Sequence, residues 1–324
     1  MADPKPVAIS CGEPAGIGIE ITVDAWKSLK DDVPLLWLGD PNHLPKGTAF
    51  EVVPDPSEAR EVCSRALPVW AMDFQTPRVA GTPDPTHAKG TISSIETAVG
   101  FVTGGKCAAL CTAPIHKAAL KEGADFAFPG HTEFLAHLAG RGDAVMMLAC
   151  DELRVVPATI HIPLADVPEQ LTARLLTDTI LVTNAALKRD FGIDAPRMAV
   201  AGLNPHAGEN GKMGSEEIEM ISPVLDALRN EGLDISGPLS ADTMFHAAAR
   251  KTYDVAICMY HDQALIPIKT IDFSGGVNVT LGLPFVRTSP DHGTAFDIAG
   301  KGIADPTSMI AAIRMAAQMA EARS

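Results

Sequence analysis

The chain has 324 residues, of which 46% are hydrophobic and 20% charged, a balance typical of globular proteins and unlike that of disordered or fibrous chains. Its 26 lysines and arginines against 40 aspartates and glutamates give a net charge of −14, which argues against nucleic acid or an anionic membrane as partner. No apolar run reaches the ~18–20 residues of a membrane-spanning helix, and we recognise no signal peptide, so we expect a cytoplasmic protein. The length suggests about two domains.

Short apolar runs alternate with longer helical patterns along the chain. The runs predict strands over 7–10, 35–38, 69–72, 107–111, 145–148, 198–201 and 255–258. Because such runs suit strands buried on both faces, we expect an α/β fold whose mostly parallel sheet is covered by flanking helices. The proline- and glycine-rich stretches 41–57 and 77–90 are predicted surface loops, with His43 and His87 facing solvent.

Two helices have clear boundary signals. Asp166 is a predicted N-cap, and Gly192 a predicted stop, for a helix whose apolar face holds Leu171, Leu175, Val182 and Ala186. Asp305 and Pro306 predict the start of the last helix. The six cysteines form no C-x-x-C pair and most lie in apolar runs, so we expect reduced thiols and no disulfides.

Polar side chains follow the predicted strands where each strand ends, which is where open α/β sheets bind ligands. In chain order these are His116 with Lys117, His161, His206 and His261. Each histidine alone is more often a hydrogen-bonded structural residue than a metal ligand. The last three lie far apart in the sequence, so only the fold could bring them together as imidazole ligands of a metal ion.

Two glycine-containing turns, 12–18 and 130–133, each precede a predicted helix and could bind an anion. Neither is a Rossmann or P-loop motif, and a tight turn or a plain helix cap explains them equally well. Downstream, Lys269, Asn278 and Arg287 stand out in a largely apolar segment, where a guanidinium or an ammonium could bind carboxylate or phosphate.

Several ordered motifs together resemble the PdxA family of dehydrogenases of pyridoxal phosphate biosynthesis, over nearly the whole chain. They lie at 12–18, 112–117, 130–133, 204–209, 237–245, 260–263 and 278–295. The stretch 292–306 is also similar to the adenine-binding loop of isopropylmalate and isocitrate dehydrogenases. The resemblance implies two α/β domains of that dehydrogenase-like fold with the active site in the cleft between them. One domain would comprise 1–128 plus 285–324 with the NAD loop, and the other 129–284 with the metal ligands and the dimer interface.

The resemblance also implies roles for individual residues. The metal ligands would be His161, His206 and His261, shared between the subunits of a homodimer. Substrate would be bound by His131, Thr132, Lys269, Asn278 and Arg287. Catalytic candidates are Asp242, Lys269 and Lys117, and the cofactor-binding residues would be His292, Gly293, Thr294 and Asp297.

The implied reaction is the NAD- and metal-dependent oxidation of 4-phosphooxy-L-threonine at C3, followed by decarboxylation to 3-amino-2-oxopropyl phosphate. Asp297 would hydrogen-bond the ribose hydroxyls and repel a 2′-phosphate, which favours NAD over the alternative, NADP. The expected metal is one divalent ion per site: zinc, magnesium or cobalt. The alternatives are a sister dehydrogenase acting on D-threonate or D-erythronate 4-phosphate or on a diol carboxylate, a zinc hydrolase using the three histidines, and a non-catalytic binding protein.

Overall fold

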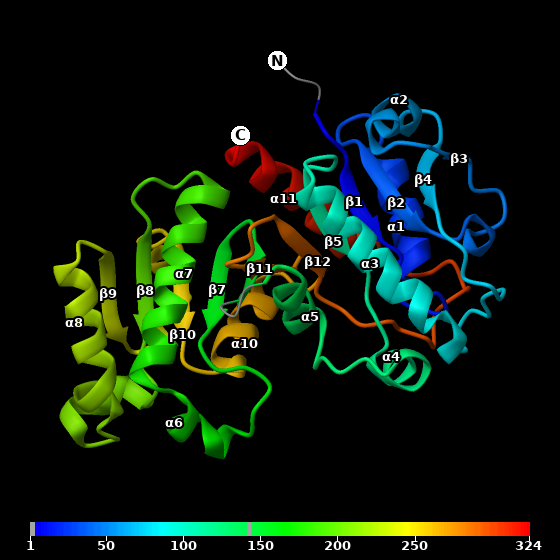
Figure 1. The fold of residues 1–324 in the computed structure, drawn as a ribbon. Coiled ribbons are helices and arrows are strands. Elements are labelled where there is room, and N and C mark those ends of the chain that lie inside the picture. The colour runs from blue at the N-terminus through cyan, green and yellow to red at the C-terminus, as the bar shows by residue number, and fades with distance from the viewer. Residues whose placement is uncertain (1–3, 141–143) are drawn as a thin grey trace. The chain divides into compact units, whose positions relative to one another are not determined.

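The computed structural model describes residues 4–140 and 144–324 and divides into two compact units. Unit 1 is Met1–Gly142 together with Leu283–Ala322, and unit 2 is Asp143–Gly282. The chain thus leaves unit 1 once and returns to it near its end, as the colours of Figure 1 show. The domain borders that the family resemblance implied are 128/129 and 284/285.

The sheet of unit 1 is entirely parallel. Its strand order is β3 (Phe50–Val52), β4 (Leu67–Ala71), β2 (Leu35–Gly39), β1 (Val7–Ser10), β5 (Ala109–Thr112) and β12 (Arg287–Pro290). Every residue of β1, β2, β5 and β12 is buried. Burial on both faces requires covering helices, which explains why β1, β2 and β5 appear in the sequence as largely apolar runs.

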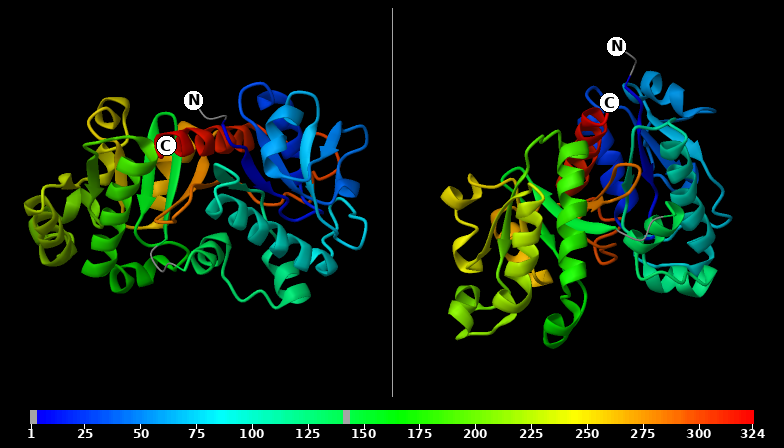
Figure 2. Two further views of the ribbon diagram at one scale, coloured as in Figure 1. Left: turned by 45° about the horizontal axis from the view of Figure 1, so that its top comes forward. Right: turned by 60° about the vertical axis from the view of Figure 1, so that its left-hand side comes forward.

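Helices cover both faces of this sheet. They are α1 (Gly18–Leu29), α2 (Ala59–Cys63), α3 (Ala88–Thr103), α4 (Lys117–Ala124), α5 (His131–Leu138) and α11 (Thr307–Ala322), with 3-10 turns at Pro41–His43, Pro56–Glu58 and Pro85–His87. The helix α3 packs on one face, while α1 and α11 pack together on the other (Figures 1 and 2). The core on the α3 side includes Ile95, Val99, Phe126, Phe134 and Leu135.

The sheet of unit 2 is mixed. Its order is β11 (Val277–Leu281), β6 (Val145–Cys150), β7 (Leu153–Pro157), β10 (Val255–Cys258), β8 (Arg197–Ala201) and β9 (Asp234–Leu239). The strand β6 runs antiparallel to both β11 and β7, and the other pairs are parallel. Only two residues link β6 to β7, a length that permits a hairpin and forbids a parallel crossover.

The helices of unit 2 also lie on both sides of its sheet. They are α6 (Val167–Gln170), α7 (Ala173–Phe191), α8 (Ser222–Asn230), α9 (Ala247–Arg250) and α10 (His261–Ile271), with short helical turns at Leu164–Asp166, Pro205–Gly211, Glu217–Ile221 and Ala241–Thr243. The helix α10 packs on one face and α7 on the other (Figure 1). This arrangement confirms the predicted α/β class with a mostly parallel sheet.

One predicted helix boundary is wrong. The long helix does not start at Asp166, because Leu171 takes a non-helical backbone angle, with ψ at 86°, and separates α6 from α7. The N-cap of α7 is Thr172, whose hydroxyl accepts a hydrogen bond from the amide of Leu175. The stop at Gly192 is confirmed, since that residue adopts the left-handed conformation with φ at 65°.

The prediction that His43 and His87 face solvent is wrong. Their side chains are 2% and 1% exposed, and both Nε2 atoms lie within hydrogen-bond distance of the carbonyl of Thr76. The two rings pack edge to face with centroids 5.1 Å apart, and His43 packs on Phe74 in the same way. The stretch 41–57 also contains the strand β3, which was not predicted, and Thr76, just before the stretch 77–90, supplies the hydrogen-bond partner of both histidines.

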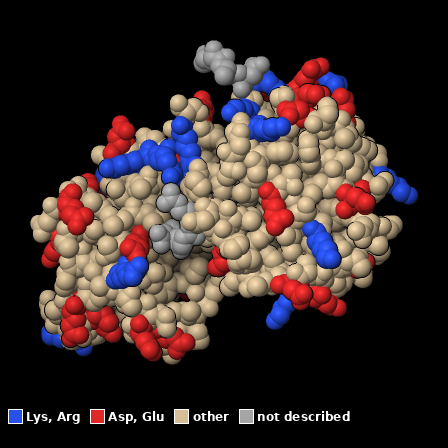
Figure 3. Space-filling view, in the orientation of Figure 1, with Lys and Arg blue, Asp and Glu red and all other residues tan. Residues whose placement is uncertain are grey.

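The thiols and the surface agree with the sequence. All six cysteines are free and buried, which confirms the expected absence of disulfides. Within the described residues no helix has the length and apolarity to cross a bilayer. On the face shown in Figure 3, acidic and basic side chains are scattered in small groups over a largely uncharged surface.

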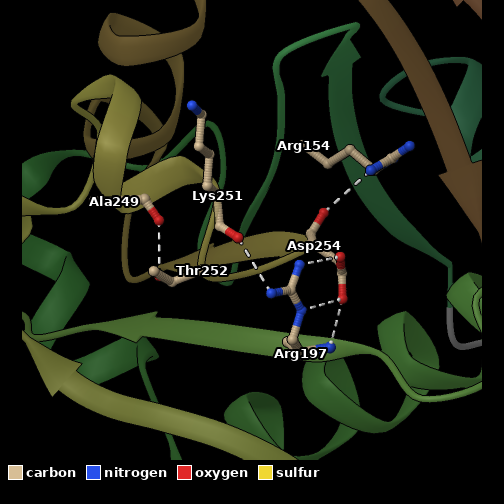
Figure 4. Close-up of polar contacts among 6 residues, drawn as sticks. All are labelled: Arg154, Arg197, Ala249, Lys251, Thr252 and Asp254. Atoms are coloured by element: carbon tan, nitrogen blue, oxygen red, sulfur yellow. Dashed lines mark hydrogen bonds and ion pairs between the residues drawn. The ribbon is translucent and has the colours of Figure 1, made fainter.

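At the amino-terminal edge of the unit 2 sheet, the carboxylate and the backbone carbonyl of one residue, Asp254, link three strands. Asp254, directly before β10, accepts hydrogen bonds from the amide and guanidinium of Arg197 at the start of β8 (Figure 4). Arg154 in β7 donates to the carbonyl of Asp254 at 3.3 Å. These contacts hold the strands in register at the edge opposite to the one where ligands bind in open sheets.

Candidate active site

Two of the predicted metal ligands lie together in unit 2. His161 follows β7 and His261 begins α10 directly after β10, and their ring centroids are 5.6 Å apart. Both line a cavity of about 320 Å³, together with Thr159, Ile160, Ile162, Leu164, Val167, Tyr260 and Asp262. The pairing of β7 with β10 brings these residues together, since parallel neighbours place their carboxyl ends side by side.

Asp262 orients one of these histidines. Its carboxylate lies 2.7 Å from Nδ1 of His261, so that nitrogen donates the hydrogen bond and Nε2 keeps its lone pair. Histidines that bind metal usually donate their second nitrogen to a carboxylate in this way. The sequence analysis did not single out Asp262, although its position directly after His261 is a usable signal.

His206, the third predicted ligand, lies on a strained turn after β8. It is the first of six consecutive residues with positive φ, which extend from 206 to 211 and which we call the left-handed turn. Its side chain is exposed. Among the described residues, no group of three His, Cys, Asp or Glu side chains is arranged to hold a metal ion within one chain.

The remaining unit 2 candidates lie on different elements. Asp242 is exposed in the turn Ala241–Thr243, and its carboxylate accepts a hydrogen bond from Ser240 at 2.5 Å. Lys269 lies on α10 with its Nζ 5.8 Å from the ring centroid of Phe273. Asn278 lies on β11, and its Oδ1 is buried with no hydrogen-bond partner among the described residues. An unsatisfied buried acceptor of this kind is suited to a ligand's donor group.

In unit 1, a basic set is formed by Lys117, His131 and Arg287, at the start of α4, the start of α5 and in β12 respectively. Arg287 is only 2% exposed, and its Nη2 donates to the hydroxyl of Thr112 at 2.6 Å. Burial lowers the pKa of Arg287 to about 10, which still leaves it charged at neutral pH. A buried guanidinium at this position can bind an anion, and the charge of Glu133 acts on its pKa in the direction opposite to burial.

His131 lies close to both cations of the basic set. Burial lowers its pKa well below the usual value, and the charges of Arg287 and Lys117 lower it further. The imidazole is therefore neutral at physiological pH, and its Nε2 is buried without a hydrogen-bond partner among the described residues. Thr132, the next residue of α5, is half-buried at the positive end of the same helix. Together these groups can bind a phosphate or a carboxylate.

The predicted cofactor residues lie on a loop of unit 1 that α1 holds in place. The amide of Ile17 donates to the carbonyl of Thr294 at 3.0 Å, and Glu20 Oε1 accepts from the amide of Gly300 at 2.6 Å. A Cβ at Gly16 would lie 2.8 Å from the carbonyl oxygen of Thr294, so only glycine permits this approach. The turn 12–18 therefore packs against this loop and helps to hold it in position.

Within that loop, the four cofactor candidates differ in exposure. Asp297 and Gly293 are exposed, Thr294 is half-buried, and the Nε2 of His292 is buried with no hydrogen-bond partner among the described residues. Ala295 has a positive φ of 45°. The exposed carboxylate of Asp297 can accept hydrogen bonds from a ligand's hydroxyl groups, and the buried Nε2 of His292 can bond to a ligand's polar group.

Backbone strain concentrates at these loops. Among the described residues, eight non-glycine residues have positive φ, and six of them are His161, the four non-glycine residues of the left-handed turn, and Ala295. Such conformations cost about 1–2 kcal/mol each and persist only where the surrounding structure imposes them. The strain is found in three loops that follow strands and hold predicted ligand-binding residues.

Comparison with known proteins bears on the function of these groups. A family model described as pyridoxal phosphate biosynthetic protein PdxA matches residues 31–316. A 4-hydroxythreonine-4-phosphate dehydrogenase of Roseobacter denitrificans is 63% identical over 316 residues, 97% of each chain. The crystal structure of a 4-hydroxythreonine-4-phosphate dehydrogenase from Klebsiella pneumoniae is 36% identical, with a TM-score of 0.89 over 98% of this chain and 99% of that one. A terephthalate 1,2-cis-dihydrodioldehydrogenase from Burkholderia xenovorans is 27% identical, with a TM-score of 0.69 over 97% and 98%.

Proposed function

The chain belongs to the PdxA family of pyridoxal phosphate biosynthetic proteins, as its motifs predicted, and on this premise we propose that it is a 4-hydroxythreonine-4-phosphate dehydrogenase. The observation that supports this best is the basic set of unit 1, in which Arg287 is buried. A substrate with both a phosphate and a carboxylate needs positively charged groups to bind it. The net charge of −14 makes the overall field of the protein unfavourable for anions, so a local basic set has to supply them.

We assign the anionic groups of the substrate to Arg287, His131 and Lys117 in unit 1 and to Lys269 in unit 2. Arg287 can bind an anion through two parallel hydrogen bonds, whereas the two lysines act as point charges. The neutral His131 donates a hydrogen bond without adding charge. Asn278 and Thr132 bind the polar groups that remain.

The loop residues fit an NAD cofactor. Asp297 is an exposed carboxylate that can accept hydrogen bonds from ribose hydroxyls and would repel a 2′-phosphate. His292 presents a buried nitrogen that lacks a partner within the described residues. The adenosine is therefore assigned to His292, Gly293, Thr294 and Asp297.

The donor chemistry of unit 2 fits a divalent metal ion. His161 and His261 supply imidazoles whose ring centroids are 5.6 Å apart, and Asp262 leaves Nε2 of His261 available as a ligand. His206 would be the third ligand, contributed by the second subunit of a homodimer. When bound, NAD supplies the acceptor for the hydride from C3, and the metal supplies positive charge at the C3 oxygen.

The chain's own residues then position the substrate for two steps. Oxidation at C3 removes a hydride and the hydroxyl proton and leaves a 3-keto acid. The C1–C2 bond breaks, CO₂ leaves, and C2 takes a proton, giving 3-amino-2-oxopropyl phosphate. Asp242 is assigned to orient the amino group and to relay a proton, with Lys269 and Lys117 as the other acid–base candidates.

A second candidate substrate is a diol carboxylate, because a dihydrodiol dehydrogenase shares the fold at 27% identity. Phosphorylated threonate and erythronate are the further alternatives within this chemistry. The basic set is suited to any substrate with two anionic groups, whether these are a phosphate and a carboxylate or two carboxylates.

The test is a substrate panel with the purified protein, NAD and a divalent metal. We expect NADH formation and 3-amino-2-oxopropyl phosphate from 4-phosphooxy-L-threonine, with the highest kcat/KM of the panel. A higher kcat/KM with an erythronate phosphate, a threonate phosphate or a diol carboxylate would assign the protein to that sister activity. Hydrolysis of a substrate without NADH formation would overturn the dehydrogenase proposal.

A further inference from the structure

The left-handed turn is the most strained backbone segment among the described residues. His206, Ala207, Glu209 and Asn210 have φ values between 42° and 55°, and Gly208 between them has φ at 77°. At about 1–2 kcal/mol for each non-glycine residue, the turn opposes several kilocalories per mole of the folding free energy. Its side chains are mostly exposed, so packing of the turn itself does not offset this cost.

One buried carboxylate holds the base of this turn. Glu217 is 2% exposed, and its Oε1 accepts a hydrogen bond from the backbone amide of Asn204 at 2.7 Å. Its Oε2 accepts a second bond from the Asn204 side-chain amide at 3.0 Å. That amide also donates to Glu216 at 2.7 Å. Asn204 is the residue from which the turn starts, two positions before His206.

The shape around Glu217 is adapted to this contact. A Cβ added to Gly208 would lie 2.6 Å from Glu217 Oε2, and one added to Gly202 would lie 2.9 Å from Oε1. Real Cβ atoms do not approach so closely, so both glycines leave space for the carboxylate. Glu217 therefore fills the concave side of the segment from β8 to the left-handed turn.

The helix that presents Glu217 is itself irregular. Its first turn, Glu217–Ile221, is a π-helix, in which the amide of Ser222 bonds to the carbonyl of Glu217. Pro223 follows directly, and a proline ring clashes with the carbonyl four residues earlier, which explains why the turn widens here. Wide turns of this kind inside helices are often found beside functional sites.

We propose that Glu217 is a positioning residue that orients His206 for metal binding, acting through Asn204 and the left-handed turn. The proposal rests on the assignment of His206 as a metal ligand. A buried carboxylate, two glycines shaped around it and a π turn are more than a surface loop requires, and they act together on the one predicted ligand that begins a run of six residues with positive φ. Glu217 itself does not touch substrate or metal.

The test compares Co²⁺ affinity of the full-length protein among variants, measured by absorbance and chelator competition. Glu217→Ala should weaken Co²⁺ binding about 10–100-fold, the usual effect of removing a residue that orients a metal ligand. Glu217→Gln should lose less Co²⁺ affinity, because the side-chain carbonyl of glutamine can still accept a hydrogen bond from the Asn204 amide. Asn204→Ala should reproduce the effect of Glu217→Ala. Glu219→Gln, an exposed position on the same π turn, should leave affinity unchanged.

Thermal unfolding and circular dichroism separate positioning from folding. If Glu217→Ala is folded and binds Co²⁺ as tightly as the unmodified protein, the positioning role is wrong. If that variant does not fold, the Co²⁺ affinity of Glu217→Gln tests the proposal instead, because glutamine is close to isosteric with glutamate. His206→Ala is the reference: it should lose Co²⁺ and turnover with its fold intact. Unchanged Co²⁺ affinity in His206→Ala would overturn the metal assignment, and the positioning proposal with it.

Discussion

Arg287 illustrates how a single residue can set the chemistry of a site. The protein carries a net charge of −14, so its overall field repels phosphorylated ligands. The buried guanidinium of Arg287 bonds to Thr112 and lies near the neutral His131 and Lys117. These groups make a local region of positive charge. Binding of an anion there depends on this local arrangement, because screening by salt is weak in a buried site.

Asp297 provides a prediction at the same scale. Replacing it with alanine removes both the acceptor for ribose hydroxyls and the charge that would repel a 2′-phosphate. Asp297→Ala should therefore narrow the preference for NAD over NADP, by about 10-fold or more if one charge-assisted hydrogen bond is lost. The measurement is kcat/KM with each cofactor.

The control for that experiment is Asp291→Ala, in the same loop but outside the four cofactor positions. It should leave the NAD to NADP ratio of kcat/KM unchanged. An unchanged ratio in Asp297→Ala as well would remove Asp297 from the cofactor site.

At the scale of elements, the contact between α1 and the cofactor loop joins the sheet of unit 1 to its proposed NAD site. Glu20 is 9% exposed and accepts from the amide of Gly300 at 2.6 Å. Glu20→Ala should lower the free energy of unfolding by about 1.5–3 kcal/mol and raise KM for NAD more than it changes kcat. Glu20→Gln keeps an acceptor and should behave closer to the unmodified protein.

Asp24→Ala on the exposed side of α1 is the matched control, since its ion pair with Lys27 is solvent-exposed. It should change stability by about 0.5 kcal/mol or less. If Glu20→Ala loses stability while KM for NAD stays constant, the loop is not part of the cofactor site.

The Asp254 cluster makes a second prediction at this scale. The hydrogen bond from Arg197 holds the pKa of Asp254 below its ordinary value, with Arg154 acting in the same direction. Asp254→Asn should cost about 1–3 kcal/mol of unfolding free energy at pH 7, measured by urea denaturation. Because the folded-state pKa is lowered, this contribution is complete above the ordinary carboxyl pKa and is lost as pH falls through the lowered one.

The difference between Asp254→Asn and the unmodified protein should therefore shrink at pH 3. The control is Asp178→Asn, whose side chain is half exposed and lies 3.5 Å from Arg174. It should have little effect at either pH. If the loss of unfolding free energy in Asp254→Asn does not change with pH, the negative charge of Asp254 is not what stabilises its contacts with Arg197 and Arg154.

At the scale of the whole molecule, the proposed metal site draws its ligands from two subunits. Mixing two inactive variants tests this, because a heterodimer of His206→Ala with His161→Ala keeps one intact site. Random pairing should restore up to about a quarter of the activity of the unmodified protein. His206→Ala with His261→Ala should do the same.

The mixture of His161→Ala with His261→Ala is the control, since both residues line one cavity in one chain and every heterodimer site would lack a ligand. It should recover no activity. If no mixture recovers activity, the ligands do not come from two subunits. If only the control mixture recovers, His161 and His261 serve different sites.

Seven strands and the helix stop at Gly192 were predictable because their patterns are local. A buried strand needs a continuous apolar run, and Gly192 ends a helix because left-handed backbone favours glycine. The strands β3, β7, β9, β11 and β12 were missed. Buried β12 begins with Arg287 and holds Thr288 and Ser289, polar residues that give no hydrophobic signal.

The sequence by itself determined the α/β class, the family and the positions of the candidate ligands, because these depend on residue type, spacing and ordered motifs. The tertiary structure alone decided which of them meet: strand pairing in unit 2 brings His161 to His261, and burial beside Thr112 gives Arg287 its altered pKa. It also decided that His43 and His87 are buried and that Glu217 bonds to Asn204 at the base of the left-handed turn. Contacts between distant residues depend on the path of the chain in space, which no local pattern encodes.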